Sequence, residues 1–331
     1  MLKDFDALKQ IVAVRGPKRC AVASAGDEHT LEAVFAAASL GYVTPVLIGA
    51  TACQADHYAS GQPYRLVNCP EGQNPSAIAV GLVRGGEADF ILKGHMATAD
   101  LLRPIINKQT GLNDNGFITH FGLMQLYGHP KLRAMSDAAV IPHPSLDDKA
   151  RIVAICADTL RALGVKCPVV AALCATETVS EKMPETLDAK ALVTMGVRGD
   201  FGDAVVLGPI SYDLATSPES AVIKGYDSPF AGQADLLLVP QMVTGNVMSK
   251  IWNADERNIL AGCLVGARVP VGLTSRSASM AEKLTSLLLC SALCGDALFG
   301  DALFGDAGPR GLEPQCSVST LSIKTQEVNH D

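Results

Sequence analysis

The sequence has no run of apolar residues long enough to cross a bilayer. Gly, Pro or charged residues interrupt each apolar segment, and the longest candidate is LTSLLLCSALC at 284–294. The net charge is -7 and there is no long basic run, which argues against a nucleic-acid footprint and against a basic membrane-binding patch. We therefore expect no transmembrane helix, no membrane or nucleic-acid partner, and small molecules as ligands.

Several common site motifs are also missing from the sequence. It has no CxxC pair and no HExxH, so no metal site is predicted. It has no GxxxxGK[ST] loop, no GxGxxG after a strand and no GxSxG, which removes support for common nucleotide-binding and hydrolase classes. Four histidines lack the spacing of metal ligands, and we interpret them as turn residues: His95, His120, His129 and His143.

The N-terminus and the cysteines indicate the compartment. MLKDFDALKQ carries acidic residues and lacks the basic and apolar regions of a signal peptide, so a cytoplasmic location is expected. Ten cysteines occur at irregular spacing, several inside apolar runs such as VVAALCA. They are typical of buried free thiols in a reducing compartment.

The chain has 331 residues, 48% of them hydrophobic, enough to bury one large core or two smaller ones. Short β-branched runs alternate with segments of helical period. The runs predict strands at 20–24, 45–49, 64–69, 89–94, 168–175, 204–208, 234–240 and 262–275. Helices are expected at 29–43, 75–88, 146–165, 184–196, 246–254 and 279–292. This alternation predicts a parallel sheet covered by helices, with ligands bound where strands turn into helices.

The first such turn is LKGHMATADLLRP at 92–104. A strand ends at Lys93 and Gly94, and a helix begins near Thr98, which is a candidate N-cap. Free amides at a helix start attract anions such as phosphate, and Arg103 one turn later can add a bidentate contact. The alternative is a capped surface helix with a solvated arginine.

The second turn is AMSDAAVIPHP at 134–144, where Ser136 and Asp137 interrupt an apolar strand. A polar pair in a buried strand needs partners. It is therefore either a structural hydrogen-bonding node or part of a site.

The third turn is VPQMVTGNVMSKIW at 239–252, in which a strand runs into Thr244, Gly245 and Asn246 before a helix. Gly245 allows a ligand to approach the backbone closely, and Asn246 offers a donor and an acceptor. Lys250 supplies positive charge one turn later. An ordinary helix start with a solvent-facing lysine remains the alternative.

The fourth turn is GLTSRSASMAEKL at 272–284. Ser279 and Glu282 fit an S-x-x-E capping box. Capping does not explain Ser275 and Arg276, which lie earlier, on the bend. There, Arg276 can face an anionic substrate, and Ser275 can hydrogen-bond a reacting oxygen.

The last part of the chain differs in composition. GDALF occurs twice in tandem near residue 300, followed by a polar, turn-rich stretch. Too little apolar material is present to offset the entropy of ordering it. We predict that 295–331 is a disordered, low-complexity tail without a function in the site.

The motifs KG…TADLLRP, SDAAV.P.P, MP.TLDA, GPISYDLA, P…TGN…K and GA..PV.LTSR occur in an order typical of one family. From about residue 10 to about 294 the chain resembles the phosphate acetyl/butyryltransferase family, and most of all its butyryl branch. The resemblance implies a two-domain α/β/α fold similar to isocitrate and isopropylmalate dehydrogenases, with the active site in the interdomain cleft. The first domain would be 1–135 plus 274–294, the second 136–273, and the protein a homodimer or larger homo-oligomer.

The resemblance also implies the reaction, in which acyl-CoA and inorganic phosphate give acyl phosphate and CoA, reversibly. CoA is a substrate here, and neither a metal nor a bound cofactor is required. The family's serine-arginine pair falls on Ser275 and Arg276, and its phosphate-binding arginine falls on Arg103. An aspartate of the acetyl branch falls on Glu282, which is one methylene longer and becomes the candidate base.

The remaining candidates are assigned to phosphate and CoA binding. Gly245 and Asn246 match the family's Gly-Asn turn at that end of the cleft. The strand-to-helix turns supply the others: Lys93, Gly94, Thr98, Ser136, Asp137 and Lys250.

Two other hypotheses remain open. One is an NAD-dependent dehydrogenase of the same broad fold acting on a small hydroxy acid. That class would need metal-binding carboxylates or histidines, and no suitable cluster is apparent. The other is a binding protein with a decayed site, against which the joint presence of Ser275, Arg276 and Arg103 argues.

Overall fold

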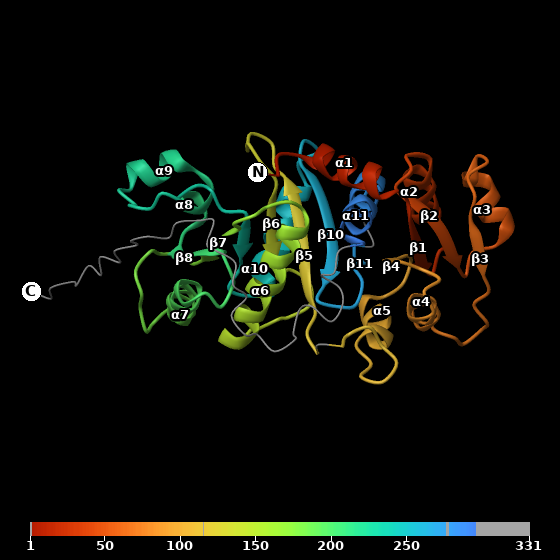
Figure 1. Ribbon diagram of the computed structural model, residues 1–331, viewed down its shortest axis with the longest axis horizontal. Helices are drawn as coiled ribbons and strands as arrows, with labels where there is room; N and C mark the ends of the chain where they lie inside the picture. Colours follow the sequence, from red (N-terminus) through yellow and green to blue (C-terminus); the bar gives the residue numbers. More distant parts are fainter. Residues whose placement is uncertain (1, 115, 276–277, 296–331) are drawn as a thin grey trace, which may run out of the picture.

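The computed structural model describes residues 2–114, 116–275 and 278–295. The described strands are β1 (Lys18–Ala23), β2 (Val43–Ile48), β3 (Arg65–Val67), β4 (Phe90–Lys93), β5 (Thr119–Gln125), β6 (Arg133–Ser136), β7 (Val169–Leu173), β8 (Val205–Ile210), β9 (Leu236–Leu238), β10 (Ile259–Val265) and β11 (Val271–Gly272). The helices are α1 (Phe5–Arg15), α2 (Glu28–Ser39), α3 (Ala52–Ala59), α4 (Pro75–Arg84), α5 (Thr98–Ile105), α6 (Leu146–Ala162), α7 (Pro184–Arg198), α8 (Tyr212–Thr216), α9 (Pro218–Ile223), α10 (Met242–Asn253) and α11 (Met280–Leu293). Figure 1 shows that they form one long, twisted sheet with helices on both faces.

Local sequence explains where the helices begin and end. In α6, Ser145 Oγ accepts a hydrogen bond from Asp148 N at 3.1 Å, and the Asp148 carboxylate accepts one from Ser145 N at 2.9 Å. This capping box begins the helix at the expected residue. The helix ends at Ala162, three residues before the predicted end, because Gly164 adopts a positive φ of 92°.

The strand order is β3-β2-β1-β4-β11-β10-β5-β6-β9-β7-β8. The strands from β3 to β11 are parallel to one another, as are those from β6 to β8. Between the two sets, β5 and β10 pair antiparallel with their neighbours. The expectation of a wholly parallel sheet is therefore wrong, because short connections without a crossover helix join β5 to β6 and β10 to β11.

The segment 262–275, expected as a single strand, forms β10 and β11 with a reversal between them. Gly266 has a φ of 92° at the start of that reversal, a conformation that suits glycine. β5 is an element that the sequence pattern did not reveal. The other predicted strands and helices are present, with shifted ends.

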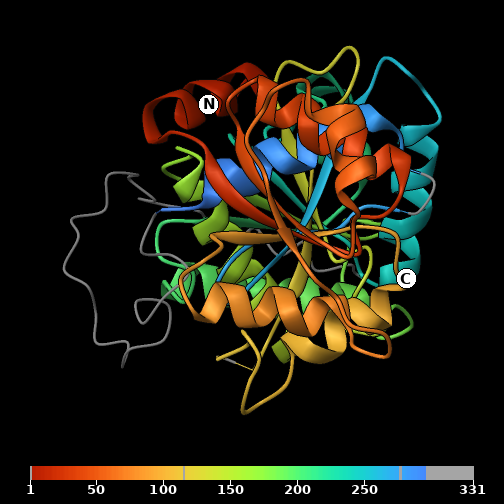
Figure 2. The same ribbon diagram turned by 90° about the vertical axis from the view of Figure 1, so that its right-hand side faces the viewer.

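The two faces of the sheet are packed differently. On one face a single core runs through both strand sets, from Leu92 of β4 to Leu236 of β9. Because side chains alternate along a strand, the residues adjacent to these two face the other side of the sheet. There, Ile91 and Leu237 belong to two separate cores. Figure 1 shows α4 and α5, which cover the first of these cores, at the lower right, and α8 and α9, which cover the second, at the upper left. Figure 2 shows α4 beneath the strands and α1 and α2 above them.

The gap between the two cores falls on the two central strands. Along β10, Leu264 belongs to the first core, Leu260 packs on the second, and Gly262 lies between them. On β5, His120 and Gly122 occupy the same side, between the two cores. We call these three residues the central strip. Two of its three residues are glycines, so the His120 side chain fills the space between the two cores.

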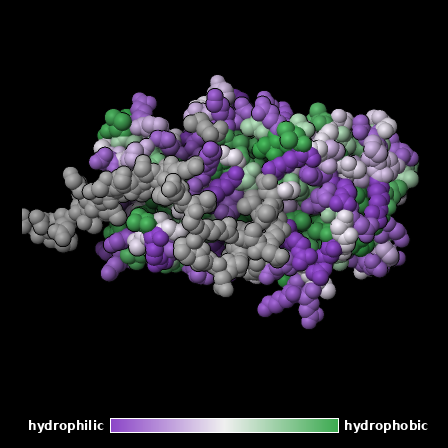
Figure 3. Space-filling view, in the orientation of Figure 1, coloured by the Kyte–Doolittle hydropathy of each residue, from purple (hydrophilic) through white to green (hydrophobic). Residues whose placement is uncertain are grey.

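The predicted domain boundary at 135/136 falls inside β6, and one sheet passes through both predicted domains. The division into 1–135 plus 274–294 and 136–273 stays a prediction. The predicted tail lies outside the described residues, apart from Gly295. Hydrophilic and hydrophobic side chains are interspersed on the face seen in Figure 3. Within the described ranges, the helices are too short or too polar to traverse a lipid bilayer.

Candidate active site

The ends of β4 and β11 bring two candidate segments together. The strands are parallel neighbours, with Gly272 paired to Leu92, so their carboxyl ends meet at one edge. The Lys93 side chain is only 4% exposed, and its Nζ lies 3.5 Å from the carbonyl oxygen of Thr274. Ser275 comes next in the chain and is exposed. Arg276, the second half of the predicted pair, lies outside the described residues.

Gly94 is required by the backbone around it. A Cβ at this position would lie 2.1 Å from the carbonyl oxygen of Ser24, and Gly94 N donates to the Ala23 carbonyl at 2.8 Å. Only glycine lets the chain pass this close to the end of β1. Its described contacts are therefore structural, and they fix where Lys93 and the start of α5 lie.

The first turn of α5 has no side-chain cap. The helix begins at Thr98, as predicted, but the N-cap is Ala97 and no side chain bonds to the amides, so the expectation that Thr98 caps the helix is wrong. A side chain one residue inside the helix cannot take the cap position. Arg103 is 75% exposed, and its Nη1 lies 3.7 Å from the Asp100 carboxylate. That weak pair leaves the guanidinium accessible to an anion.

Ser136 is the last residue of β6, and Asp137 follows it; both are fully buried, at 0% and 1% exposed. Ser136 Oγ lies 2.9 Å from Thr119 Oγ1, and Thr119 Oγ1 also donates to Asp137 Oδ2 at 2.7 Å. His120 N donates to the same carboxylate oxygen at 2.9 Å. These bonds tie β5 to the end of β6.

The second oxygen of the Asp137 carboxylate holds the turn that follows. Oδ1 accepts hydrogen bonds at 2.7 Å from the backbone N–H groups of Ala139 and Val140. The strand ends here because the carboxylate binds the backbone of the turn in place of a neighbouring strand. Of the two alternatives for this pair, the structure supports the hydrogen-bonding node.

α10 begins at Met242, four residues before the predicted start, so Gly245 and Asn246 lie inside the helix and the prediction of a turn there is wrong. A Cβ on Gly245 would lie 3.0 Å from Ala138 Cβ and 3.1 Å from the Asp137 carbonyl oxygen. Asn246 Nδ2 donates to the Ala138 carbonyl at 3.3 Å. The close approach at Gly245 is thus to the turn after β6. It sets the position of α10 and leaves the opposite face of the helix exposed.

Glu282 is held at its backbone by Ser279, whose Oγ accepts from Glu282 N at 3.1 Å, so the N-cap half of the predicted capping box is confirmed. The carboxyl group faces α10. Burial raises the pKa of Glu282, while Lys283, Lys250 and a hydrogen bond with Asn253 act in the opposite direction. Glu282 Oε2 is buried without a hydrogen-bond partner within the described part of the chain.

These contacts connect the candidates. Lys93 touches the segment that leads to Ser275, and that segment continues into α11, where Glu282 faces Lys250. Lys250 shares α10 with Asn246, which bonds the turn after Asp137. The structure gives no hydrogen bond or ion pair between Arg103 and another candidate that it describes, although α5 follows directly from Gly94.

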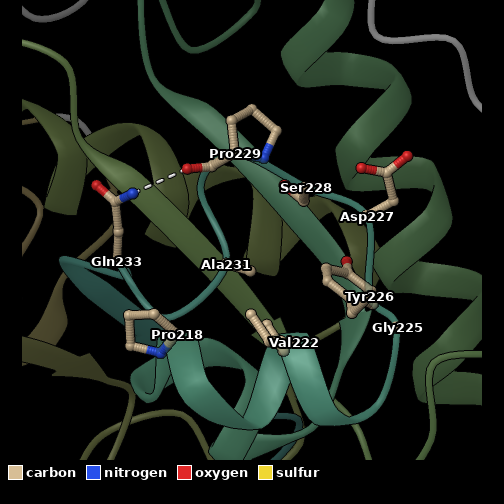
Figure 4. Close-up of a pocket in the computed structure, with 10 residues that line it drawn as sticks. Pro218, Val222, Gly225, Tyr226, Asp227, Ser228, Pro229, Ala231 and Gln233 are labelled. Carbon is tan, nitrogen blue, oxygen red and sulfur yellow. Dashed lines mark hydrogen bonds between the residues drawn. The ribbon is translucent and has the colours of Figure 1, made fainter.

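One surface cavity lies away from all of these residues. It measures about 410 Å³ and lies between α9 and the segment 225–233. Figure 4 shows Tyr226, Asp227 and Gln233 around it, with Gln233 Nε2 donating to the Pro229 carbonyl at 2.8 Å. It contains none of the predicted site residues.

Sequence reasoning missed the position of His120. It lies in β5 and not in a turn, so the interpretation of His120 as a turn residue is wrong. The alternation of apolar Phe121 and Leu123 with His120 and Gly122 was a signal for a half-buried strand. Across the described residues, no three His, Cys, Asp or Glu side chains are grouped as metal ligands.

Solved structures define the class of fold. A 4-hydroxythreonine-4-phosphate dehydrogenase from Klebsiella pneumoniae matches with a TM-score of 0.52 at 12% identity, covering 83% of this chain and 99% of that chain. This likeness shows the fold alone. A branched-chain phosphotransacylase from Enterococcus faecalis V583 matches with a TM-score of 0.76 at 28% identity, covering 83% and 98%. The predicted fold class, similar to isocitrate and isopropylmalate dehydrogenases, is confirmed, and its better-matching member is a phosphotransacylase.

Sequence comparison then gives the family. The protein-family model described as phosphate acetyl/butaryl transferase matches residues 67–291. Phosphate butyryltransferase from Clostridium acetobutylicum is 36% identical over 305 residues, covering 89% of this chain and 99% of that protein. The chain belongs to the phosphate acetyl/butyryltransferase family. It is an enzyme of the phosphate acyltransferase class, and the family implies acyl-CoA and phosphate as substrates.

Proposed function

We propose that this enzyme transfers a short acyl group, butyryl in the first instance, between CoA and inorganic phosphate at the meeting point of β4, β11, α10 and α11. The observation that carries the proposal is the contact of Lys93 with the backbone leading to Ser275. This contact places the buried Lys93 side chain beside Thr274, the residue before Ser275. The same segment leads into α11, which carries Glu282, a carboxyl group of raised pKa.

The phosphate is assigned to the β4–α5 side of the site. The first turn of α5 offers backbone N–H groups that no side chain caps, and Arg103 is exposed one turn later. Helix N-termini and arginine are both suited to phosphate. Arg276, carried over from the family pattern, would add a further positive charge. We assign Lys93 to the electrostatic stabilisation of the phosphate on this side of the site.

In the direction from acyl phosphate to acyl-CoA, the thiol of CoA is the nucleophile. A CoA thiol of pKa near 8.5 is only a few per cent ionised at neutral pH, so a base is useful. Glu282 takes the thiol proton, and the sulfur attacks the carbonyl carbon to give a tetrahedral oxyanion, which Ser275 stabilises by donating a hydrogen bond. The C–O bond to phosphate then breaks, phosphate leaves, and the proton on Glu282 is returned to solvent. Both substrates are bound at once, and no acyl-enzyme forms.

Lys250 lies beside Glu282, on the same helix as Asn246, and is exposed. A surface lysine next to the base is suited to a phosphate group of CoA. Gly245, on the buried face of α10, and Asp137 act indirectly by holding this helix against the turn after β6. We therefore assign Lys250 and Asn246 to the CoA side.

The test is a coupled measurement of thiol release. Wild-type enzyme is mixed with phosphate and acetyl-, propionyl-, butyryl- or branched acyl-CoA, and free CoA is followed. We expect phosphate-dependent release that is fastest with butyryl-CoA. If no acyl-CoA gives phosphate-dependent release of CoA, the proposal is wrong. A faster rate with another acyl group would change only the acyl chain assigned to the enzyme. Arg276→Ala should lower turnover by orders of magnitude while leaving the fold intact.

A homo-oligomer and a cytoplasmic location are also proposed. Both rest on the resemblance to the family and on the composition of the chain. Sedimentation velocity of the purified protein checks the first, and a monomer across micromolar concentrations would contradict it.

A further inference from the structure

The central strip of the sheet carries a histidine, His120, that has no role in the proposed acyl transfer. His120 lies on the face where the two cores separate, and Gly122 and Gly262 lie beside it on β5 and β10. Because Gly122 and Gly262 have no side chains, the His120 imidazole occupies the space over the two strands. A Cβ on Gly122 would lie 3.5 Å from His120 Cε1, and one on Gly262 would lie 2.9 Å from Nε2.

The imidazole lies next to the strand end that leads to the serine. The point where a Cβ of Gly262 would lie is 2.9 Å from His120 Nε2 and 2.8 Å from the carbonyl oxygen of Leu273. Leu273 directly precedes Thr274, whose carbonyl contacts Lys93, and Ser275. His120 is therefore close to the segment that joins the phosphate side to the base.

The backbone of His120 is fixed, but its ring is not satisfied. His120 N donates to the Asp137 carboxylate at 2.9 Å, and that carboxylate is held in turn by three further donors. By contrast, Nδ1 is buried and has no hydrogen-bond partner in the portion of the chain that the structure describes. Buried polar atoms are nearly always paired in native proteins, so an orphaned ring nitrogen at a site requires an explanation.

The surroundings keep the ring neutral. Burial lowers the pKa of His120, and the nearby Asp137 carboxylate only partly opposes this. A neutral imidazole has one N–H donor and one acceptor nitrogen. A neutral donor can stabilise developing negative charge without first binding an anion of its own.

We propose that His120 is a further substrate-contacting residue of the acyl-transfer site, whose imidazole N–H donates a hydrogen bond to the carbonyl oxygen of the acyl group. This inference rests on the proposed function. As the nucleophile bonds to the carbonyl carbon, the π electron pair moves onto that oxygen, and His120 stabilises the charge together with Ser275. When the C–S or C–O bond breaks, the pair returns to the carbonyl and the hydrogen bond weakens.

The first experiment compares His120→Leu and His120→Gln with wild type. Loss of an oxyanion donor typically lowers kcat by about 100- to 1,000-fold, which we expect for His120→Leu, with the KM for phosphate within about threefold. His120→Gln keeps an N–H donor and should lose less. The melting temperature of His120→Leu should not fall, because the change removes an unpaired buried nitrogen. His57, exposed on α3, supplies the matched controls His57→Leu and His57→Gln.

Two outcomes would overturn the inference. One is a kcat of His120→Leu within about threefold of wild type, since a lost oxyanion donor costs far more. The other is an equal loss of activity in both variants with a parallel fall in melting temperature, which would make His120 structural.

A second readout separates this inference from the proposed function. The imidazole resonances of His120, assigned by their loss in His120→Gln, are followed in wild-type protein while butyryl-CoA is added without phosphate. A shift supports contact with the acyl group, and no shift at saturating butyryl-CoA overturns it. Inactive wild-type enzyme would contradict the proposed function alone, and the resonances would still decide on His120.

Discussion

At the scale of single residues, the backbone and the carboxyl group of Glu282 make separate contacts. Its backbone N–H is bound by Ser279 at the start of α11, which is a structural role. Its carboxyl group faces Lys250 and Asn253 on another helix, and one of its oxygens is buried without a described partner. Capping explains the first observation and not the second, which is why we propose the carboxyl group as the base.

Glu282→Gln tests this role in the reaction. Glutamine keeps the length of the side chain and the backbone bond to Ser279, but it cannot accept the thiol proton. We expect kcat to fall by about 100- to 10,000-fold, the usual contribution of a general base. The rates of thiol loss from CoA and acetyl or butyryl phosphate measure it. Near-normal turnover would show that Glu282 acts only at the start of α11 and is not the base.

The same variant should change stability in a pH-dependent way. The pKa of Glu282 is raised in the folded protein, so the carboxyl group favours folding below its unfolded pKa, and this contribution is lost as pH rises through the folded pKa. The melting temperature of Glu282→Gln relative to wild type should therefore be higher at pH 8 than at pH 4. Glu219→Gln, an exposed first-turn change in α9, is the control and should show no such trend.

At the scale of elements, the position of α10 depends on a glycine. Gly245→Ala would bring a methyl group to 3.0 Å from Ala138 Cβ and 3.1 Å from the Asp137 carbonyl oxygen, so the helix or the turn must shift by a few tenths of an ångström. We expect at least a tenfold rise in the KM for CoA, because the helix that carries Lys250 is displaced. Gly81→Ala in α4 has no atom within 4 Å of the new methyl group. It should be neutral or stabilise by about 0.5–1 kcal/mol. Equal KM values for both variants would contradict this account of α10.

Most elements could be predicted from the sequence because their periodicity is strong and their ends carry caps or glycines. The failures have local causes. At 262–275 the reversal lies within an almost unbroken apolar stretch, and β11 has only two residues, so no alternation marked the change of direction. In α10 the pattern TGN suggested a turn, but packing against Ala138 keeps these residues helical.

The candidate site was predictable only where the chemistry is local. Lys93, Lys250 and Glu282 belong to three segments in which a strand leads into a helix, and the sequence identified those segments as informative. The environment of His120 could not be inferred in this way. It depends on the register between β5 and β10, in which Gly262 pairs with Gly122, and these residues are far apart in sequence.

At the scale of the whole molecule, stability depends on a buried ion pair in the second set of strands. Lys131 is 7% exposed and Asp235 is 8% exposed, and Lys131 Nζ donates to the Asp235 carboxylate. The other carboxylate oxygen accepts from Val169 N at 2.9 Å, so Asp235 connects the beginnings of β6, β7 and β9. Removing one partner leaves the other charge buried.

Asp235→Ala should therefore lower the free energy of unfolding by about 3–5 kcal/mol. The matched control is Asp114→Ala, which breaks the exposed pair with Arg268 at 2.9 Å and should cost less than about 1 kcal/mol. Urea denaturation of both variants measures the difference. Similar losses in the two variants would show that the buried pair contributes no more than the exposed one.

The place of β11 has a consequence for how the protein is made. β11 pairs with β4 on one side and β10 on the other, in the middle of the sheet, yet it follows β4 by more than half of the chain. While a ribosome is still producing residues before Val271, β4 has an open edge that its final neighbour cannot yet cover. The first four strands can pair early, but the sheet cannot be completed until β11 has been made. Until then β4 exposes unpaired backbone groups to which a chaperone or another chain can bind.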